Sequence, residues 1–465
     1  MARFFRSSLL LTSFSAVLLA FTSWNTFGVS ALSSGEDVIE RDLCIIGGGS
    51  AGTYSAIRMR DQGKSVVVVE KKGRMGGHTE TFTDPATGLT TDAGVIVFHN
   101  LTIATDYFAR FNIPLTTRNV SMNAQYIDLR TGESVPYTPQ DPTEAFAAYA
   151  AQLAKYPFLD TGFNLPDPVP EELLIPFRDF AAKYNLGPIM GTIWSISQGI
   201  GDLLSQPTLY VMKVFGKDIL RSIQVGFLTT KNHDNSELYE KATAELGDDV
   251  LLNSHVIYTS REGAGVEVEV ETPLGRKLIR AKKLLIAIPP KIENLQGFDL
   301  DETEREIFEQ FSNNAYYTLV LKGSNIPPAV NNARADLPYL LPKLPDVYTV
   351  EKSEIPNYYH VKYGSPYEVS DEQVKQTVLT EVARLQDLES QHKGHDELEI
   401  AFYSNHSPTF LAFSPSAIAD GFYDRLNGLQ GHLNTFYTGA TFETLDSTLI
   451  WRFTETILPR IFDER

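Results

Sequence analysis

The sequence predicts an α/β protein in which a parallel-sheet domain is interrupted by the segments of a second, α+β domain. Two observations predict this arrangement. A strand, a glycine-rich turn and a helix follow one another early in the chain, and further strand-like runs return after two long segments of different pattern. The chain has 465 residues with 43% hydrophobic content, which is more than one compact domain usually holds. We therefore expect two domains.

The first element is an apolar strand at residues 42–46, and a glycine-rich turn at residues 47–52 connects it to a helix. Gly47 permits the tight turn, Gly49 lets a pyrophosphate approach the backbone at the helix N-terminus, and Gly52 lets helix and strand pack closely. Glycines at this spacing can also simply break a loop, but the flanking strand and helix favour a dinucleotide site.

The next strand, residues 65–70, is apolar on both faces and ends in Glu70, 18 residues after Gly52. A carboxylate at this distance accepts hydrogen bonds from the adenosine ribose hydroxyls, so the spacing predicts that Glu70 holds the ribose. A second glycine fingerprint is missing from the sequence, and a separate NADPH site is therefore not expected.

The residues after Glu70 resemble the second signature of the flavin-containing amine oxidase superfamily, through Arg74, Met75, Gly76 and Gly77. In that superfamily the paired glycines bring backbone against the ribityl and pyrophosphate groups of FAD. The resemblance implies an amine oxidase-like fold, with a discontinuous Rossmann-type FAD-binding domain and an α+β substrate domain. It also implies that the cofactor is FAD rather than a nicotinamide.

Four later segments resemble the same superfamily in the same order. Residues 90–100 resemble the segment along the flavin ring, and residues 245–260 resemble the strand that meets the adenine. Residues 283–290 resemble the strand that leads out of the FAD domain, and residues 434–458 resemble its last strand and helix. The cofactor contacts that these segments imply are Asp92, Gly94, Val256, Gly439, Ser447 and Thr448.

His78 stands where relatives often have arginine. A histidine beside a flavin can hydrogen-bond the FAD phosphates or ribityl, accept a proton, or carry the flavin covalently. We favour the first role, because a positioned base also needs a suitable substrate pose. His99 raises the same question, since a packed neighbour and a participant look alike in a sequence.

Three positions depart from the superfamily. The first carboxylate after Gly439 is the late Glu443, so the ribityl contact is expected from backbone or hydroxyl groups. Tyr316 and Tyr317 stand where amine-oxidising members tend to have a lysine near flavin N5, and Tyr317 is the candidate for a catalytic group facing N5. Cys44 is the only cysteine and lies in the first strand, which excludes cysteinyl attachment of the flavin.

The pattern also divides the chain into domains. The FAD-binding domain is expected at residues 38–112, 226–292 and 426–465. The substrate domain is expected at residues 113–225, which have helical spacing, and at residues 293–425, which mix strands with one charged helix.

Residues 1–31 have the anatomy of a secretory signal peptide, with two early arginines, an apolar stretch and a small-residue cleavage site. The alternative, a membrane anchor, needs a longer apolar stretch, and no later span is expected. We therefore expect secretion or an endomembrane lumen, with potential glycosylation at Asn119 and Asn405. The sequon at Asn100 is expected to stay unmodified because it would lie near the flavin.

A net charge of −18 without a basic tract argues against a nucleic-acid partner, and no metal-ligand spacing of His and Cys is visible. Within the superfamily, the runs GGGSAGTYSAIR, VVVVEKKGRMGGHTET and DAGVIVFHN resemble fungal FAD proteins described as β-cyclopiazonate dehydrogenases. This resemblance implies a dehydrogenase or oxidase that transfers a hydride from a small hydrophobic substrate, such as a secondary metabolite, to flavin N5, with O₂ or another electron acceptor. Two alternatives remain open: a redox-neutral FAD-dependent fatty-acid double-bond isomerase, and a non-catalytic FAD-binding protein.

Overall fold

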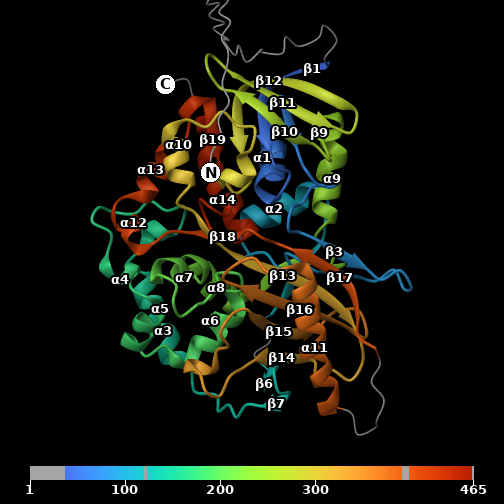
Figure 1. Cartoon of the computed structure of the whole chain (residues 1–465), viewed down its shortest axis with the longest axis vertical. Coiled ribbons are helices and arrows are strands. Elements are labelled where there is room, and N and C mark those ends of the chain that lie inside the picture. The colour runs from blue at the N-terminus through green and yellow to red at the C-terminus, as the bar shows by residue number, and fades with distance from the viewer. Residues whose placement is uncertain (1–36, 120–122, 390–396, 463–465) are drawn as a thin grey trace, which may run out of the picture. The chain divides into compact units, whose positions relative to one another are not determined.

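The computed structural model describes residues 37–119, 123–389 and 397–462, so the expected signal peptide lies outside the described residues. From Asp37 onward the chain forms one compact unit, and two large sheets lie within it (Figure 1). No helix within the described ranges is long and apolar enough to cross a membrane.

The first sheet has seven strands in the order β10-β11-β12-β1-β2-β9, with β19 paired to β12. Neighbouring strands among β1, β2, β9, β12 and β19 pair in parallel, while β10 and β11 continue the sheet as antiparallel strands. This confirms the predicted α/β class. The strands are β1 (Asp37–Ile46), β2 (Val66–Val69), β9 (Val250–Leu251), β10 (His255–Ser260), β11 (Val266–Thr272), β12 (Gly275–Ile286) and β19 (Thr435–Tyr437).

Strand β2 is four consecutive valines, and all of them are buried. Parallel strands have such continuous apolar runs because helices cover both faces of the sheet. Each fully buried valine stabilises the fold by roughly 1.5–3 kcal/mol. Helix α1 (Ser50–Asp61) packs against α14 (Ser447–Ile461) and α9 (Glu237–Leu246). Trp451 of α14 stacks on Tyr54 of α1 at 5.6 Å between ring centroids, which fixes the two helices against each other.

The second sheet has eight strands in the order β17-β13-β16-β15-β14-β6-β7, with β18 paired to β13. Helix α11 (Asp371–Glu389) covers one face through a cluster that includes Val374, Val378 and Val382. The strands are β6 (Gln125–Asp128), β7 (Glu133–Ser134), β13 (Ser312–Lys322), β14 (Ala329–Asn332), β15 (Asp346–Lys352), β16 (Tyr358–Ser365), β17 (Glu399–Asn405) and β18 (Thr409–Ala412).

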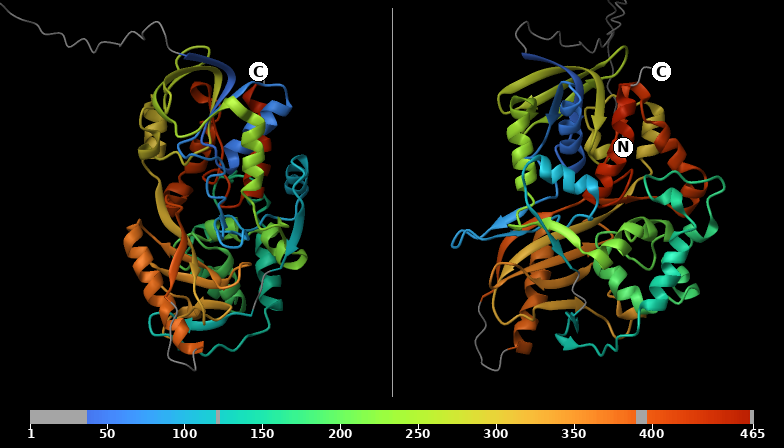
Figure 2. Two further views of the ribbon diagram at one scale, coloured as in Figure 1. Left: turned by 90° about the vertical axis from the view of Figure 1, so that its right-hand side faces the viewer. Right: turned by 180° about the vertical axis from the view of Figure 1, so that it is seen from behind.

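The spacing of residues 113–225 predicts helices throughout this segment, but the structure shows that part of it forms strands. The segment begins with β5 (Leu115–Arg118), which pairs with β8 (Phe227–Thr230), and with β6, which joins the second sheet beside β14. Strands of four residues are too short to show a period, and their partners are distant in sequence. The helices that follow lie beside the second sheet (Figure 2). They are α3 (Thr143–Leu153), α4 (Glu171–Leu174), α5 (Phe177–Lys183), α6 (Met190–Ile196), α7 (Thr208–Val214) and α8 (Lys217–Val225).

Apart from the first residue of β1, every strand of the first sheet lies in the ranges expected for the FAD-binding domain. Every strand of the second sheet lies in the ranges expected for the substrate domain. The exact boundaries stay a prediction, because these residues form one compact unit. The remaining helices and strands are β3 (Thr81–Thr83), β4 (Thr90–Asp92), α2 (Thr102–Arg110), α10 (Glu302–Phe308), α12 (Pro415–Ala419) and α13 (Phe422–Gly428).

Candidate active site

The carboxyl ends of the parallel strands β1, β2, β12 and β19 meet at one edge of the first sheet. Strand β12 pairs with β1 and β19 up to its last residue, Ile286. Gly47, Glu70 and Gly439 follow the ends of β1, β2 and β19. Ligands of open α/β sheets bind outside the carboxyl ends of the strands, so the structure brings these three predicted residues to the expected edge.

Gly47, Gly52 and Gly77 of the two glycine clusters leave no room for a side chain. Gly47 has a φ of +99°, and a Cβ there would lie 2.5 Å from Ile288 Cγ2. A Cβ on Gly52 would overlap the carbonyl oxygen of Gly47, and a Cβ on Gly77 would lie 2.9 Å from the Cα of Gly49. The clusters therefore meet backbone to backbone beside the start of α1, which is the cradle that a pyrophosphate needs.

Hydroxyl groups without well-formed hydrogen bonds lie at the same place. Ser50 Oγ, Thr79 Oγ1 and Tyr239 Oη are buried and lack a hydrogen bond of normal geometry, although the Tyr239 hydroxyl interacts with those of Ser50, Thr79 and Ser447. The Tyr239 ring packs on Gly76, where a Cβ would lie 3.1 Å from it. Buried hydroxyls without well-formed hydrogen bonds are costly, and an anion at the N-terminus of α1 could satisfy them. Tyr239 was not predicted, because its helix carries no sequence signal for a cofactor.

Glu70 is buried at the end of β2. Its Oε2 accepts a hydrogen bond from the backbone N–H of Gly48 at 2.7 Å, and its Oε1 accepts one from that of Lys72 at 2.7 Å. A carboxylate has about four lone-pair sites, so each oxygen can accept one more bond, as two ribose hydroxyls require. The backbone N–H of Ser254 donates to the Glu70 carbonyl at 2.9 Å, which brings the start of the strand that carries Val256 to this end of β2.

Arg74 organises the second glycine cluster from within. Its guanidinium donates to the carbonyl oxygens of Met75, Gly77 and Thr79 at 3.1, 2.9 and 3.0 Å, and it pairs with Glu80. The loop that presents Gly76 and Gly77 is therefore held by a side chain that the resemblance had placed at the cofactor.

His78 stacks on His406, with ring centroids 4.3 Å apart and planes 11° from parallel. His406 Nε2 lies 3.2 Å from Glu80 Oε2. His78 is exposed although its ring stacks on the buried His406, and we call the space that the His78 ring borders the opening. Burial and the neighbouring His406 hold the pKa of His78 well below its usual value, which keeps the ring neutral near pH 7.

Three more residues border this opening beside His406. The Tyr316 ring lies 6.0 Å from that of His406, and its hydroxyl donates to Gln198 at 3.0 Å. A Cβ on Gly199 would lie 3.4 Å from Leu445 Cδ1 and 3.7 Å from Tyr316 Cγ. Leu445 is 36% exposed, although the four residues before it are buried. The opening therefore has aromatic and aliphatic walls.

Tyr317 does not face this opening, and the prediction of Tyr317 as the group near flavin N5 is wrong. Its hydroxyl donates to the carbonyl of Val369 at 2.8 Å and accepts from the N–H of the same residue. The side chain is fully buried in the core under α11. Successive side chains of a strand point to opposite faces, so Tyr316, and not Tyr317, lies on the side of His406.

Asp92 and Gly94 lie beside the His78 backbone. A Cβ on Gly94 would overlap the His78 carbonyl oxygen. Asp92 Oδ1 accepts from Thr81 Oγ1 at 2.8 Å and from the N–H of Asn235 at 2.7 Å, while its Oδ2 is buried and has no partner within the described residues. Burial raises the pKa of Asp92 to about 7.

The C-terminal segment approaches the same edge. Gly439 turns with a φ of +111°, and a Cβ there would lie 4.0 Å from the Ala51 Cβ at the start of α1. Ser447 and Thr448 begin α14, and Thr448 Oγ1 accepts from the N–H of His99 at 3.0 Å. His99 itself is 1% exposed, which makes it a packed neighbour of the site.

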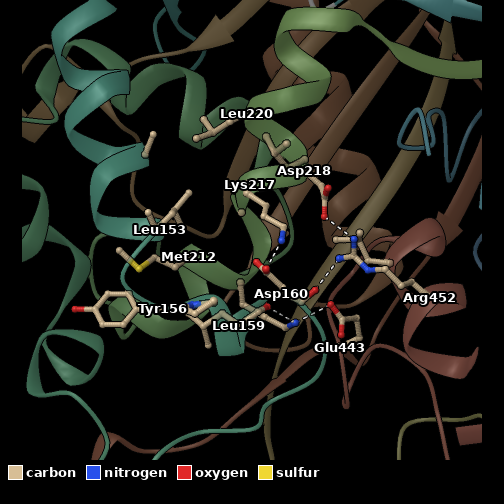
Figure 3. A pocket seen from close by; sticks show the side chains of 17 residues that line it. Leu153, Tyr156, Leu159, Asp160, Met212, Lys217, Asp218, Leu220, Glu443 and Arg452 are labelled. Carbon is tan, nitrogen blue, oxygen red and sulfur yellow. Dashed lines mark hydrogen bonds and ion pairs between the residues drawn. The ribbon is translucent and has the colours of Figure 1, made fainter. Parts of the chain in front are cut away.

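Glu443 forms a buried ion pair with Lys213 and does not supply the acidic ribityl contact. Its carboxylate lies 2.6 Å from Lys213 Nζ, with both side chains 1% exposed, and it also accepts from the N–H of Gly162. A cavity of about 220 Å³ lies beside this pair, with an apolar wall that includes Leu153 and Met212 and a charged end that includes Arg452 (Figure 3). The prediction that backbone or hydroxyl groups replace the acidic contact is compatible with this geometry.

Residues 45–111 match the NAD(P)-binding Rossmann-like domain. Across 98% of this chain and 99% of the relative, the sequence is 40% identical to the FAD-dependent oxidoreductase oblC of Cochliobolus heterostrophus. It is 36% identical to the beta-cyclopiazonate dehydrogenase of Aspergillus oryzae over 95% of this chain and 98% of that protein. The chain belongs to this family of FAD-dependent oxidoreductases.

The fold is also that of solved enzymes. The CLA-producing fatty acid isomerase from P. acnes has a TM-score of 0.75 at 20% identity, covering 91% of this chain and 99% of the other. Putrescine oxidase has a TM-score of 0.64 at 17% identity, with the same coverage. These similarities confirm the amine oxidase-like fold.

FAD is the cofactor, and the described residues fit it. The glycine cradle, the buried hydroxyls of Ser50, Thr79 and Tyr239, and the spare acceptor sites of Glu70 suit a pyrophosphate and a ribose. The individual cofactor contacts stay predictions.

Replacing Glu70 with alanine is expected to raise the Kd for FAD by at least about tenfold, because bonds from hydroxyls to a carboxylate contribute roughly 1.5–3 kcal/mol each. Flavin fluorescence titration of the apoprotein measures this Kd. Glu240→Ala, at an exposed position of α9, is the matched control and should bind FAD normally. A Glu70→Ala protein that purifies with full flavin would contradict the ribose assignment.

Replacing Asp92 with asparagine is expected to remove a pH dependence of stability. Because its pKa is raised to about 7, the folded protein holds a proton that the unfolded chain releases near pH 4. The free energy of unfolding of the wild type therefore falls as pH rises between these values, by about 1.4 kcal/mol for each unit of pKa shift. Urea unfolding at several pH values tests this, and equal slopes for both proteins over this window would refute it.

Proposed function

We propose that this enzyme dehydrogenates a small, largely apolar secondary metabolite at a C–H bond next to a nitrogen or oxygen. The observation that carries the proposal is the opening at the cofactor edge, which is lined by Tyr316 and Leu445 and contains one neutral histidine, His78. Apolar walls with few polar groups suit such a substrate. A full-length relative named for the dehydrogenation of beta-cyclopiazonate supports the same substrate class.

In this reading FAD supplies the hydride acceptor, and the protein supplies position and a dry surface. Tyr316 holds its hydroxyl on Gln198 and so presents its ring to the substrate. His406 supports the face of the His78 ring, while Gly94 lets the next segment approach the His78 backbone closely. O₂ is the proposed electron acceptor.

The alternative is a double-bond isomerase, for which the similarity in fold to a fatty acid isomerase is the reason. The test incubates purified holoenzyme with small indole-type and amine compounds and with unsaturated fatty acids, in air. A dehydrogenase gives a product two hydrogens lighter together with hydrogen peroxide. A product of unchanged mass without peroxide would establish the isomerase, and no turnover with any compound would favour a non-catalytic FAD protein.

We further propose that the chain enters the secretory pathway through residues 1–31 and acts outside the cell or in an endomembrane lumen. Asn119 is exposed, whereas the Asn405 side chain bonds Asp371 and the N–H of Ser407. Glycosylation is therefore expected at Asn119 rather than Asn405. N-terminal sequencing of the protein from culture medium, with glycosidase treatment, tests both statements.

A further inference from the structure

We propose that His78 accepts the substrate proton and that His406, held by Glu80, positions it. The inference rests on the proposed dehydrogenation. Two electrons and one hydrogen leave the substrate carbon for FAD, and the hydrogen on the neighbouring nitrogen or oxygen leaves as a proton onto a ring nitrogen of His78. The new double bond forms between these two substrate atoms, so electrons and hydrogens balance.

The two histidines differ in their exposure and in their hydrogen bonds. Neither ring nitrogen of His78 makes a hydrogen bond within the described residues, although the ring is exposed to the opening. The His406 ring is 5% exposed and points its Nε2 at Glu80. The ring nitrogens of His78 are therefore available to a bound group, which in this proposal is the substrate and replaces the hydrogen bond to FAD that the sequence favoured, and His406 is held behind the ring.

Stacking makes the charges of the two rings interdependent. At 4.3 Å between centroids, two imidazolium ions would repel each other, so His406 contributes to lowering the pKa of His78. The groups that face His78 are His406, Lys72, Glu80 and Arg74. Burial opposes ionisation of Glu80, but hydrogen bonds from His406 and Ser404 and the nearby cations hold its pKa below the usual value. Glu80 thus stays a carboxylate and accepts a hydrogen bond from the His406 ring.

The walls of the opening offer no competing base. Tyr316 keeps its hydroxyl on Gln198, and burial raises its pKa well above the usual value. Leu445 is apolar. Among the residues placed at this opening, His78 is the one that is both exposed and able to act as a neutral base.

The first test uses holoenzyme with isotope-labelled histidine and follows the ring signals by NMR as pH changes. The signal lost in His78→Gln identifies His78, and we expect it to titrate well below pH 6.5. In His406→Gln the midpoint of His78 should rise, because the neighbouring charge is gone. An unchanged midpoint in His406→Gln would show that the rings are not coupled and would overturn the positioning role. This measurement does not depend on turnover.

The second test measures the rate of flavin reduction by substrate. His78→Gln should slow it by about 10²–10⁴-fold with full flavin content and should remove the acidic limb of the pH profile. His406→Gln should shift that limb to higher pH. His432→Gln, which replaces a histidine bonded to Asp301 outside the site, is the matched control and should reduce at the wild-type rate.

Two results would overturn the proposal. One is a His78→Gln enzyme that reduces within twofold of wild type. The other is flavin that stays in the acid-precipitated pellet of the wild type and not of His78→Gln, because His78 would then be the anchor of the cofactor and not a free ring that faces the substrate. If the wild type oxidises no compound at all, the proposed function fails instead, and the NMR titration still decides the coupling of the two rings.

Discussion

Replacing Gly52 with alanine is expected to reduce flavin content to a trace and to lower the free energy of unfolding by roughly 1–3 kcal/mol. A Cβ at this position would overlap the carbonyl oxygen of Gly47, and it would lie 3.3 Å from Ala287 Cβ. Helix α1 would have to move away from the turn, and the backbone N–H groups at its start would move with it. Those groups are what the pyrophosphate is expected to contact.

The measurement is flavin absorbance per protein after gel filtration, together with urea unfolding. Gly428→Ala is the control, since a Cβ there meets nothing within 4 Å. Alanine is the better helix former by about 1 kcal/mol, so this variant should keep its flavin and gain slightly in stability. A Gly52→Ala protein with normal flavin content would show that the close approach of α1 does not govern cofactor binding.

The same glycines explain why the fold and the cofactor edge could be predicted from sequence. Backbone geometry requires Gly47 and Gly52 within one strand, turn and helix. Because these elements are consecutive in the chain, the glycine pattern can be recognised from the local sequence. Strand β2 is predictable for a similar reason, because a sheet covered on both faces demands a continuous apolar run.

The opening could not be predicted in the same way. His406 and Glu80 are separated by 326 positions in the sequence, and Tyr239 comes from a helix with no cofactor signature. Tyr316 and Tyr317 show the limit most clearly. Both residues lie in one strand, β13, and a difference of one residue decides which face of the sheet a side chain occupies. The pairing of β13 with its neighbours fixes that choice, and it lies outside the local pattern.

The second variant with a large expected effect breaks the buried ion pair between Lys213 and Glu443. Replacing Lys213 with methionine is expected to lower the free energy of unfolding by about 3–5 kcal/mol, because it leaves a buried carboxylate without its cation. Burial already raises the pKa of Glu443 and lowers that of Lys213, so each ion depends on the other. The pair joins α7 to the connection between Gly439 and α14, so flavin should also be held less tightly.

The double variant Lys213→Met with Glu443→Gln separates the pair from the rest of the site. Glutamine removes the buried charge and keeps an acceptor for the N–H of Gly162, so at least half of the lost stability should return.

The deficit of Lys213→Met should also be smaller at pH 5 than at pH 8, because an unpaired Glu443 binds a proton in the folded state more readily than in the unfolded chain. Lys217→Met removes a more exposed partner, 54% accessible, from its pair with Asp160 and should change stability by no more than about 1 kcal/mol. A double variant as unstable as Lys213→Met alone would show that the lysine stabilises the fold through its packing and its bond to the Leu159 carbonyl, and that the charge of Glu443 has little part in it.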